Sequence, residues 1–508
     1  MLGLNWHKSG ACETLAAVAG REHRVSVFQR LRTGASSMSR LLPLLFSLLL
    51  VLLPAMANAR LAGPEAWQST DKVRDLAEIR RSGVLRVLVN QSRNSSGEVK
   101  GEAIGVEYAR LRAFEQYLNR NAAAGRTVTL RLIPKAKDQL LGALQRGEGD
   151  LVAPGELLPL SGMKGVSRSL PVVRDVSLVM VGRQGGPRYQ RLEQLSGRSL
   201  ALSPGSAAGP ALARLNKQLM ARRLAPIVAE WVDPTLAVED VLEMVQAGVY
   251  PATVVEQTIA QRWAKVMPRL RIEQHLRLGD KASIHWFVRK EASMLRASAD
   301  RFLKDFDLPD NQDAAFERVY RRLYKVQYPL DRVGRQRLEK VRPTLQRYAE
   351  QIELDWLNLA ALAFKESTLN PAARGAGGAT GLMQVTPATA RAMGVSNIEQ
   401  LDRNVQASAK YLASIRRNYF ASPRLNERER MAFILAAYNL GPQRVQSMRA
   451  EARRRGLNPD QWFFQVERIA METLGMGVVA YVNSVNKYYL AYQRERYLLE
   501  ADRKTAAN

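Results

Sequence analysis

The sequence predicts a multidomain chain in which an α/β region is followed by an all-α region. Its 508 residues are too many for one hydrophobic core, so two or three domains are expected. Across residues 83–306 short apolar runs alternate with helical patterns, which is typical of a parallel sheet covered by helices. From Arg337 onward the pattern is helical, with glycine and proline interruptions and no clear strand.

The α/β region can be divided into elements from its hydrophobic pattern. Strands are expected at Gly83–Asn90, Thr127–Pro134, Asp150–Gly155, Val176–Arg183, Ser199–Gly209, Ala252–Glu256 and Ile284–Lys290. Helices are expected at Gly105–Asn119, Lys137–Arg146, Val238–Ala247 and Glu291–Phe306. The order of these elements again predicts a parallel sheet.

Charge and composition limit the chemistry. The formal net charge of +27 suits nucleic acid, anionic lipid or an anionic wall polymer equally well, and the basic residues are scattered as on a solvated cationic surface. The lone cysteine, Cys12, excludes an internal disulfide, and no histidine follows His285. A zinc site or a Ser-His-Asp triad in the C-terminal half would therefore lack its usual groups. Acid and base work there falls to Glu, Asp, Tyr or Lys, without a metal or other cofactor.

An export signal is expected near the N-terminus. A short basic start at Met38 precedes the apolar run Leu41–Met56, and the small-x-small sequence 57–59 follows it. This pattern predicts a Sec-type signal peptide at 38–59 and a mature chain beginning at Arg60, with translation starting at Met38. A long n-region or an uncleaved anchor are the alternatives. No cysteine follows the run, which excludes a lipoprotein anchor if cleavage occurs there.

The remaining boundaries follow from these patterns. We expect residues 1–37 to be an unstructured upstream extension, 60–329 the α/β domain, 330–337 a linker and 338–508 the helical domain.

Glu366 is the candidate acid of the helical domain. The helix before it, 352–365, carries Leu, Ala, Trp and Phe on nearly every face, as a core helix does. Asn370 and Pro371 end that helix, which leaves Glu366 on its last turn. Burial and the negative end of the helix dipole would both raise its pKa above the ordinary value of about 4.3, as a general acid needs. A surface glutamate at a helix end is the plain alternative.

Three further segments can supply a cleft around Glu366. The glycine-rich stretch 374–381 lets a backbone approach a ligand closely, although it could be only a flexible turn. Gln384 after it can hydrogen-bond a sugar, and Met383 can pack against one. Tyr438 and Asn439 end the helix predicted at Glu427–Leu440, and Tyr481 lies on another helix. A buried tyrosine could equally bind a backbone carbonyl.

The first region resembles the bacterial extracellular solute-binding proteins of family 3 over roughly residues 75–325. The resemblance rests on GVLRVLVN, ALQRGEGDLVAPG, LEQLSGRSLALSPGSA and IHWFVRKEASMLRASADRFLKDF in that order. It implies two α/β lobes around a cleft. The arginine that usually clamps an amino-acid carboxylate is replaced by Gly162, with Lys164 and Arg168 nearby. Asp150 and Ser206 could contact a ligand or simply cap local structure.

The second region, 338–495, is similar to the goose-lysozyme-like lytic transglycosylases. The motifs are KES, GATGLMQVTPATA, LDRNVQASAKYL, AAYNLGP and AYVNSVNKYY. Together with the first module, the chain looks like the membrane-bound lytic murein transglycosylase F group. The resemblance implies that Glu366 is the catalytic acid and base. It also implies a sugar cleft shaped by Ser367, Met383, Gln384, Tyr438, Asn439 and Tyr481.

The implied reaction needs one carboxylate rather than two. Glu399 and Asp402 are the obvious second acids, but Asp402 matches a structural position and could cap a helix. Glu366 would protonate the bond between N-acetylmuramic acid and N-acetylglucosamine, then accept the proton of the attacking muramic 6-hydroxyl. Peptidoglycan strands are the expected substrate, and a muropeptide is the expected ligand of the first module.

Several alternatives stay open on the sequence. A muramidase would hydrolyse the same bond, and a periplasmic receptor would use its C-terminal domain only to hold the wall. Nucleic acid is disfavoured by the signal peptide and the absence of a recognition motif. The expected location is the periplasm, with peripheral association at the outer membrane.

Overall fold

The computed structural model describes residues 73–99, 102–122, 127–159, 164–307, 312–325 and 327–505. The predicted start at Met38, the signal peptide at 38–59, Cys12 and Gly162 lie outside these residues. None of the helices in the described ranges combines the length and apolarity needed to cross a bilayer.

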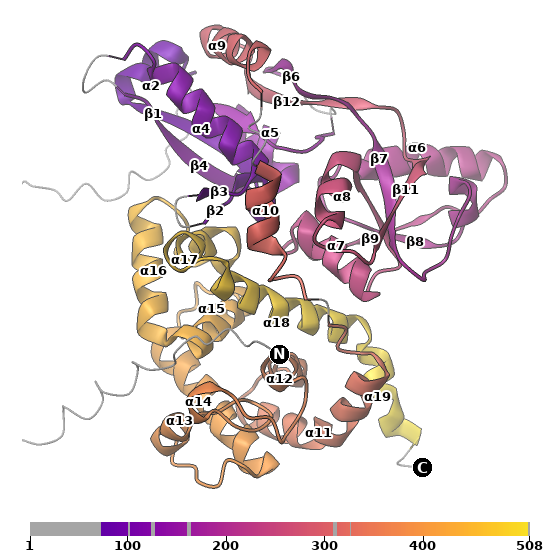
Figure 1. The fold of residues 1–508 in the computed structure, drawn as a ribbon, viewed down its shortest axis with the longest axis vertical. Helices are drawn as coiled ribbons and strands as arrows, with labels where there is room; N and C mark the ends of the chain where they lie inside the picture. Colours follow the sequence, from indigo (N-terminus) through magenta and orange to yellow (C-terminus); the bar gives the residue numbers. More distant parts are fainter. Residues whose placement is uncertain are drawn as a thin grey trace, which may run out of the picture. The chain divides into compact units, whose positions relative to one another are not determined.

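The α/β region forms two lobes, each built on a five-stranded sheet (Figure 1). In lobe 1 the strand order is β4-β1-β5-β12-β6. Its strands are β1 (Val84–Asn90), β4 (Thr129–Lys135), β5 (Leu151–Ala153), β6 (Val166–Val176) and β12 (Ala282–Arg289), with a small β2 (Glu98–Val99) and β3 (Glu102–Ala103) pair beside them. Its helices are α2 (Leu76–Ser82), α3 (Arg93–Ser96), α4 (Val106–Asn119), η1 (Lys137–Gln139), α5 (Leu140–Gln145) and α9 (Ser293–Lys304).

Lobe 2 has the strand order β11-β7-β10-β8-β9. These strands are β7 (Leu178–Arg183), β8 (Ser199–Leu202), β9 (Val228–Trp231), β10 (Ala252–Glu256) and β11 (Leu270–Arg277). The helices are η2 (Leu192–Leu195), α6 (Ala208–Ala221), α7 (Val238–Ala247) and α8 (Gln257–Ala264). The two-lobed α/β prediction is therefore confirmed.

The prediction of simple parallel sheets was wrong. Within lobe 1, β1 is parallel to β4 and β5, but β12 is antiparallel to β5 and β6. In lobe 2, β7 is antiparallel to β10 and β11. The reason is that the chain crosses between lobes twice, from β6 to β7 at Ser177 and from β11 to β12 at 278–281, and each crossing brings a strand back in the opposite direction.

The C-terminal domain, α11 to α19, is helical as predicted, and α10 (Gln312–Tyr320) precedes it. Its helices are α11 (Arg332–Gln351), α12 (Trp356–Ser367), η3 (Ala376–Gly378), α13 (Pro387–Ala392), α14 (Leu401–Tyr419), α15 (Glu427–Leu440), α16 (Pro442–Arg454), η4 (Trp462–Val466), α17 (Glu467–Leu474), α18 (Met476–Arg494) and α19 (Arg496–Thr505). Helix α11 begins inside the range 330–337, because the Asp331 side chain caps it by accepting a hydrogen bond from the Gly334 amide.

The C-terminal domain shares a hydrophobic core with lobe 2. One cluster of buried side chains runs from Val179 and Trp263 in lobe 2, through Phe316 and Tyr320 of α10, to Leu362 in α12 and the other helices of the C-terminal domain. Lobe 1 has its own cores on the two faces of its sheet. Lobe 2 therefore packs on the C-terminal domain as part of one apolar interior. Lobe 1 adds Ile104 to the same cluster and also makes polar contacts with the C-terminal domain.

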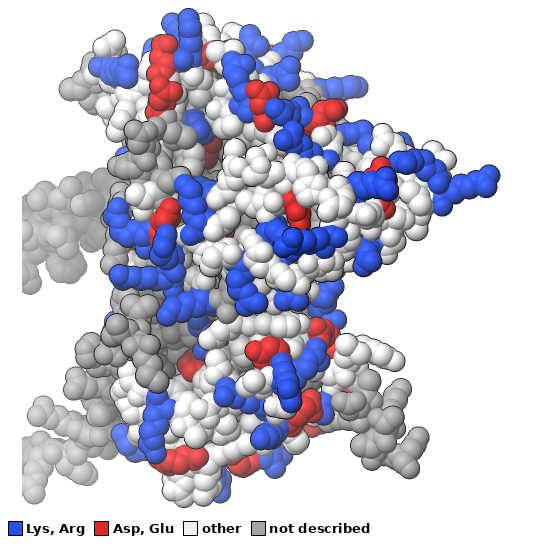
Figure 2. Space-filling model, turned by 45° about the vertical axis from the view of Figure 1, so that its right-hand side comes forward, with Lys and Arg blue, Asp and Glu red and all other residues white. Residues whose placement is uncertain are grey.

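Basic side chains are spread over the surface rather than gathered in one groove. Figure 2 shows Lys and Arg across most of the visible face, with Asp and Glu between them. This distribution is that of a solvated cationic surface.

Candidate active site

Helix α12 brings Glu366 to the edge of the C-terminal core. The Asp355 side chain caps the helix by accepting from the Leu357 amide, and the stretch 356–364 is buried. The helix ends at Ser367 because Thr368 adopts a left-handed conformation, with φ of 53°. This end lies before the predicted stop at Asn370 and Pro371. Glu366 is half-buried on the last turn, where the sequence predicts it.

Ser367 ties this helix end to the glycine-rich loop. Its Oγ donates to the Leu382 carbonyl at 2.8 Å and accepts from the Asn370 amide at 3.0 Å. The predicted sugar-binding residue thus already holds the loop against α12, one residue after Glu366.

Gln384 organises the same loop from inside. Its Nε2 donates to the Gly381 carbonyl at 2.9 Å and to the Ala373 carbonyl at 3.2 Å. A Cβ at Gly375 would lie 2.1 Å from Gln384 Oε1, so that position needs glycine. The close approach predicted for the glycines is therefore an approach to the protein's own glutamine.

Asn404, which sequence reasoning missed, anchors the other side of the loop. This fully buried side chain of α14 donates to the Thr380 carbonyl at 2.8 Å and to the Ile398 carbonyl at 2.9 Å, and accepts from the Met383 amide at 2.8 Å. An asparagine inside an apolar helical pattern was the available signal, because the residue is disfavoured there unless its amide is used.

Tyr438 fixes the segment that leads to Gln384. Its hydroxyl donates to the Met383 carbonyl at 2.8 Å and lies 3.2 Å from the Ser408 hydroxyl. Burial, and then the nearby Glu366 charge, raise the pKa of Tyr438, so it stays a neutral donor. Met383 is itself fully buried.

Tyr481 of α18 contacts Glu366 directly. Its hydroxyl donates to Glu366 Oε1 at 2.5 Å, joining side chains 115 positions apart. Burial and the Glu366 charge raise the pKa of Tyr481 well above its usual range. Lys365 Nζ lies 5.7 Å from the centre of the Tyr481 ring, and burial lowers the pKa of this lysine. The structure therefore places a carboxylate beside neutral hydroxyls at the edge of a dry core.

The remaining candidates lie differently. Asn439 is half-buried, and its side chain makes no hydrogen bond within the described residues. Asp402 is the second residue of α14 rather than its cap, and it pairs with Arg347 while accepting from the Tyr348 hydroxyl at 2.7 Å. Glu399 is exposed. Of the two acids considered as a second catalytic carboxylate, Asp402 is therefore held in structural contacts and Glu399 faces solvent.

Asp150 and Ser206 in the first module serve local structure. Asp150 accepts from Arg74 at 2.9 Å and from Arg86 at 2.6 Å, so guanidiniums surround its carboxylate. Ser206 Oγ accepts from the Ala208 amide at 3.1 Å at the start of α6. Lys164 and Arg168, beside the missing clamp, are exposed. Ser206 is not the N-cap of α6, because that position is taken by Ala207, one residue later.

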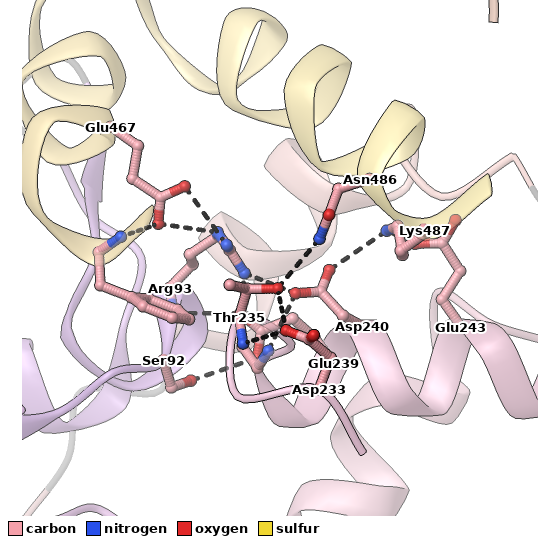
Figure 3. Close-up of polar contacts among 12 residues, drawn as sticks. Ser92, Arg93, Asp233, Thr235, Glu239, Asp240, Glu243, Glu467, Asn486 and Lys487 are labelled. Atoms are coloured by element: carbon pink, nitrogen blue, oxygen red, sulfur yellow. Dashed lines mark hydrogen bonds and ion pairs between the residues drawn. The ribbon is translucent and has the colours of Figure 1, made fainter. Parts of the chain in front are cut away.

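A buried charge cluster joins both lobes to the C-terminal domain (Figure 3). Arg93 of lobe 1 lies 2.7 Å from Asp240 of lobe 2 and 3.2 Å from Glu467 of α17. The backbone amide of Arg93 donates to Glu239 at 3.0 Å, and Lys487 of α18 lies 3.2 Å from Asp240. We call these five residues the three-way junction.

Protonation within the three-way junction depends on its charge balance. Burial would raise the pKa of Asp240, but Arg93 and Lys487 outweigh it and lower that pKa. Burial and the neighbouring Asp240 raise the pKa of Glu239 to about 7. The junction holds three acids and two cations. Sequence reasoning could not find it, because even Arg93 and Glu467, which are in contact, lie 374 positions apart.

Comparison with known proteins matches the region of the chain that contains Glu366. Residues 343–460 match the transglycosylase SLT domain. The curated relatives include membrane-bound lytic murein transglycosylase F of Desulfosudis oleivorans, 26% identical over 77% of this chain and 83% of that protein. Proteins of the same name from Cronobacter sakazakii (26%, 85% and 83%) and Pseudomonas putida GB-1 (28%, 77% and 78%) are also similar.

The solved structures that match include an ancestral arginine-binding protein bound to arginine. It is 20% identical, with a TM-score of 0.38, and the match covers 46% of this chain and 97% of that one. A mutant arginine-binding protein from T. maritima is 18% identical with a TM-score of 0.39, over 48% and 97%.

The class is a two-lobed α/β module joined to a transglycosylase SLT domain. Over most of its length the chain is similar to the membrane-bound lytic murein transglycosylase F proteins, and the resemblance read from its motifs is confirmed.

Proposed function

We propose that this chain is a peptidoglycan lytic transglycosylase with Glu366 as its acid and base. The observation that carries the proposal is the contact between Glu366, which lies in the range matched to the SLT domain, and Tyr481, which follows that range on α18. The substrate is the glycan strand of peptidoglycan, cleaved between N-acetylmuramic acid and N-acetylglucosamine. The name shared by the relatives supports the same reaction.

The reaction uses one carboxyl group twice. Protonated Glu366 donates its proton to the glycosidic oxygen, so the bond to the muramic anomeric carbon breaks and the N-acetylglucosamine hydroxyl leaves. The 2-acetamido group of the substrate stabilises the resulting positive centre. The Glu366 carboxylate then takes the proton of the muramic 6-hydroxyl, whose oxygen bonds to the anomeric carbon and forms 1,6-anhydromuramic acid. No water is consumed.

Around Glu366, the contacts support positioning roles. Tyr481 orients the carboxyl group through its hydrogen bond, and Ser367, Met383, Gln384 and Tyr438 keep the loop 374–384 beside it. Asn439, whose amide has no partner in the described chain, is available to a sugar. General acid and base catalysis contributes about 10²–10⁴-fold, and the rest comes from binding and exclusion of water.

Glu366→Gln is the decisive variant. It keeps the shape of the side chain but cannot donate the proton, so turnover of purified sacculi should fall by about 10³-fold while wall binding remains. Mass spectrometry of the wild-type products should find anhydromuramic ends. Glu399→Gln is the control and should be as active as the wild type. Reducing muramic ends would assign a hydrolysing muramidase, and wall binding without any cleavage by the wild type would assign a receptor.

For the first module we propose a sensor of cell-wall fragments. The three-way junction supports this, because Arg93 touches Asp240 of lobe 2 and Glu467 of the C-terminal domain. A change in the angle between the lobes must therefore alter contacts of the catalytic domain. The fused enzyme makes muropeptides, and the usual carboxylate-clamping arginine is replaced by Gly162.

Soluble muropeptides test the sensor. They should bind the full-length Glu366→Gln chain in calorimetry and change the rate of the wild type on sacculi. Absence of binding, or binding without a rate change, would reduce the module to a spacer or a targeting domain.

We also propose export to the periplasm with peripheral attachment at the outer membrane. The pattern at 38–59 and the membrane-bound relatives support it. N-terminal sequencing of the exported protein should find Arg60 first. A start before residue 41 would show that the apolar run is kept as an anchor.

A further inference from the structure

A cavity of about 480 Å³ lies between lobe 2 and the C-terminal domain, away from both the Glu366 site and the three-way junction. Lobe 2 contributes Arg183, Ala247 and Arg269 to its wall. The start of the C-terminal domain contributes the segment 327–337, and α12 contributes Phe364 and Thr368. Its volume is that of a small-molecule site rather than of a single ion.

The wall of this cavity is strongly cationic. It holds the guanidiniums of Arg183, Arg269 and Arg337 against one carboxylate, Asp331. Asp331 is already used, because its Oδ1 accepts from the Gly334 amide at 2.6 Å to cap α11. Three like charges around one cavity repel each other, and a bound anion would relieve that repulsion.

Two of these arginines, Arg183 and Arg269, are exposed to solvent and available to a ligand. Within the described residues, the side chains of Arg183 and Arg269 form no hydrogen bond and no ion pair. Arg183 lies over Gly248, where a Cβ would come 3.2 Å from its Cζ, and is thus held at the C-terminal end of α7. Arg337 donates to the Thr368 carbonyl at 3.0 Å and keeps further N–H groups available.

The site is separate from the catalytic carboxyl. Phe364 and Thr368 lie on one side of α12, since four residues make about one turn, and Glu366, two residues from each, lies on the opposite side. The cavity is nevertheless coupled to that helix end, because Arg337 bonds to Thr368, the residue that terminates it.

We propose that this cavity is a second ligand site, which binds a small molecule bearing anionic oxygen groups, carboxylate or phosphate, through Arg183, Arg269 and Arg337. Guanidinium groups recognise both groups by paired hydrogen bonds. Phe364, Val333 and Ala247 provide apolar wall for the body of the ligand. A ligand here contacts lobe 2 and the catalytic domain together. The inference goes beyond the proposed function and does not depend on which bond the enzyme cleaves.

Calorimetry on the full chain at low salt tests the site, with citrate as the carboxylate probe and pyrophosphate as the phosphate probe. At least one should bind with one-to-one stoichiometry, and the tighter probe identifies the anionic group. Arg183→Gln with Arg269→Gln should weaken binding at least tenfold. The matched control, Arg188→Gln with Arg214→Gln, removes two exposed charges from lobe 2 outside the cavity and should bind as the wild type does.

Two further measurements, the melting temperature and binding by the Glu366→Gln variant, check this result. The bound probe should raise the melting temperature of the wild type and the control but not of the cavity variant, whose unliganded melting temperature should match theirs. Glu366→Gln should bind the probe normally, so a failed glycosidase assay and a failed anion site are told apart. Absence of binding by both probes, or equal weakening in both double variants, would overturn the proposal.

Discussion

Lobe 1 and the C-terminal domain each place a carboxylate at the end of a helix or strand, but they surround it with different hydrogen-bond donors. Asp150 of lobe 1 is 2% exposed and accepts from the guanidiniums of Arg74 and Arg86 and from the Arg86 amide at 3.0 Å. Glu366 of the C-terminal domain is half-buried and accepts from the hydroxyl of Tyr481. Two guanidiniums compensate the charge of the first, whereas the second accepts a hydrogen bond from a neutral hydroxyl.

Glu429 extends the contrast within the C-terminal domain. Its carboxylate accepts from the Trp462 and Phe463 amides, which are neutral donors. Burial raises the pKa of Glu429 to about 7, although both amides lower it. The comparison teaches that partners decide what a buried acid can do: guanidiniums make it structural, and neutral donors leave a proton exchangeable near neutral pH.

The largest effect on stability is expected from Asp150→Asn. The change leaves Arg74 and Arg86 without their shared counter-charge, which should lower the free energy of unfolding by about 3 kcal/mol. Urea denaturation measures it. Asp138→Asn, at an exposed position of the same lobe, is the control and should change little. A loss below about 1 kcal/mol would show that Asp150 is not the structural partner described.

A smaller effect is expected from Tyr481→Phe. The variant keeps the ring but removes the hydrogen bond to Glu366, so kcat on sacculi should fall about tenfold, equivalent to roughly 1.4 kcal/mol, with little change in KM. Tyr488→Phe on the same helix is the matched control, because Tyr488 packs against Phe364 rather than bonding to Glu366. Equal activity of Tyr481→Phe and the control would contradict a positioning role.

Local patterns predicted the elements that carry the site. Helices α7 and α15 and strand β10 have the bounds expected from periodicity and glycine signals. Strand β6 was missed, because it is an edge strand with few buried residues that contains Pro171, and so it lacks an apolar alternation. Helix α6 was not assigned either, and the strand expected at Ser199–Gly209 overlapped its first two residues.

Distant contacts could not be predicted from local periodicity. The motifs selected Glu366 and Tyr481, and the structure brings them together. No pattern indicated that Arg93 would meet Glu467, or that Asn404 would hold the loop through two hydrogen bonds. Such contacts depend on how elements that are far apart in the sequence pack together. The periodicity of hydrophobic residues indicates only which face of each element is buried.

The smallest effect, and the sharpest test of the comparison, is the pH dependence contributed by Glu429. Its pKa is near its ordinary value of 4.5 when unfolded and about 7 when folded, so between these values the folded state binds more protons. Stability must then fall as pH rises from about 4.5 to 7, and the loss is complete above 7. The shift bounds this loss at about 3 kcal/mol, and relaxation around the group should reduce it to about 1 kcal/mol. Glu429→Gln still accepts from both amides but does not titrate, so it should be more stable than the wild type at pH 8 and similar at pH 4.5. Denaturation at both pH values measures the difference, with the exposed Glu399→Gln as control. An equal pH dependence in Glu429→Gln and the wild type would mean that burial beside neutral donors does not raise the pKa of Glu429 in the folded protein.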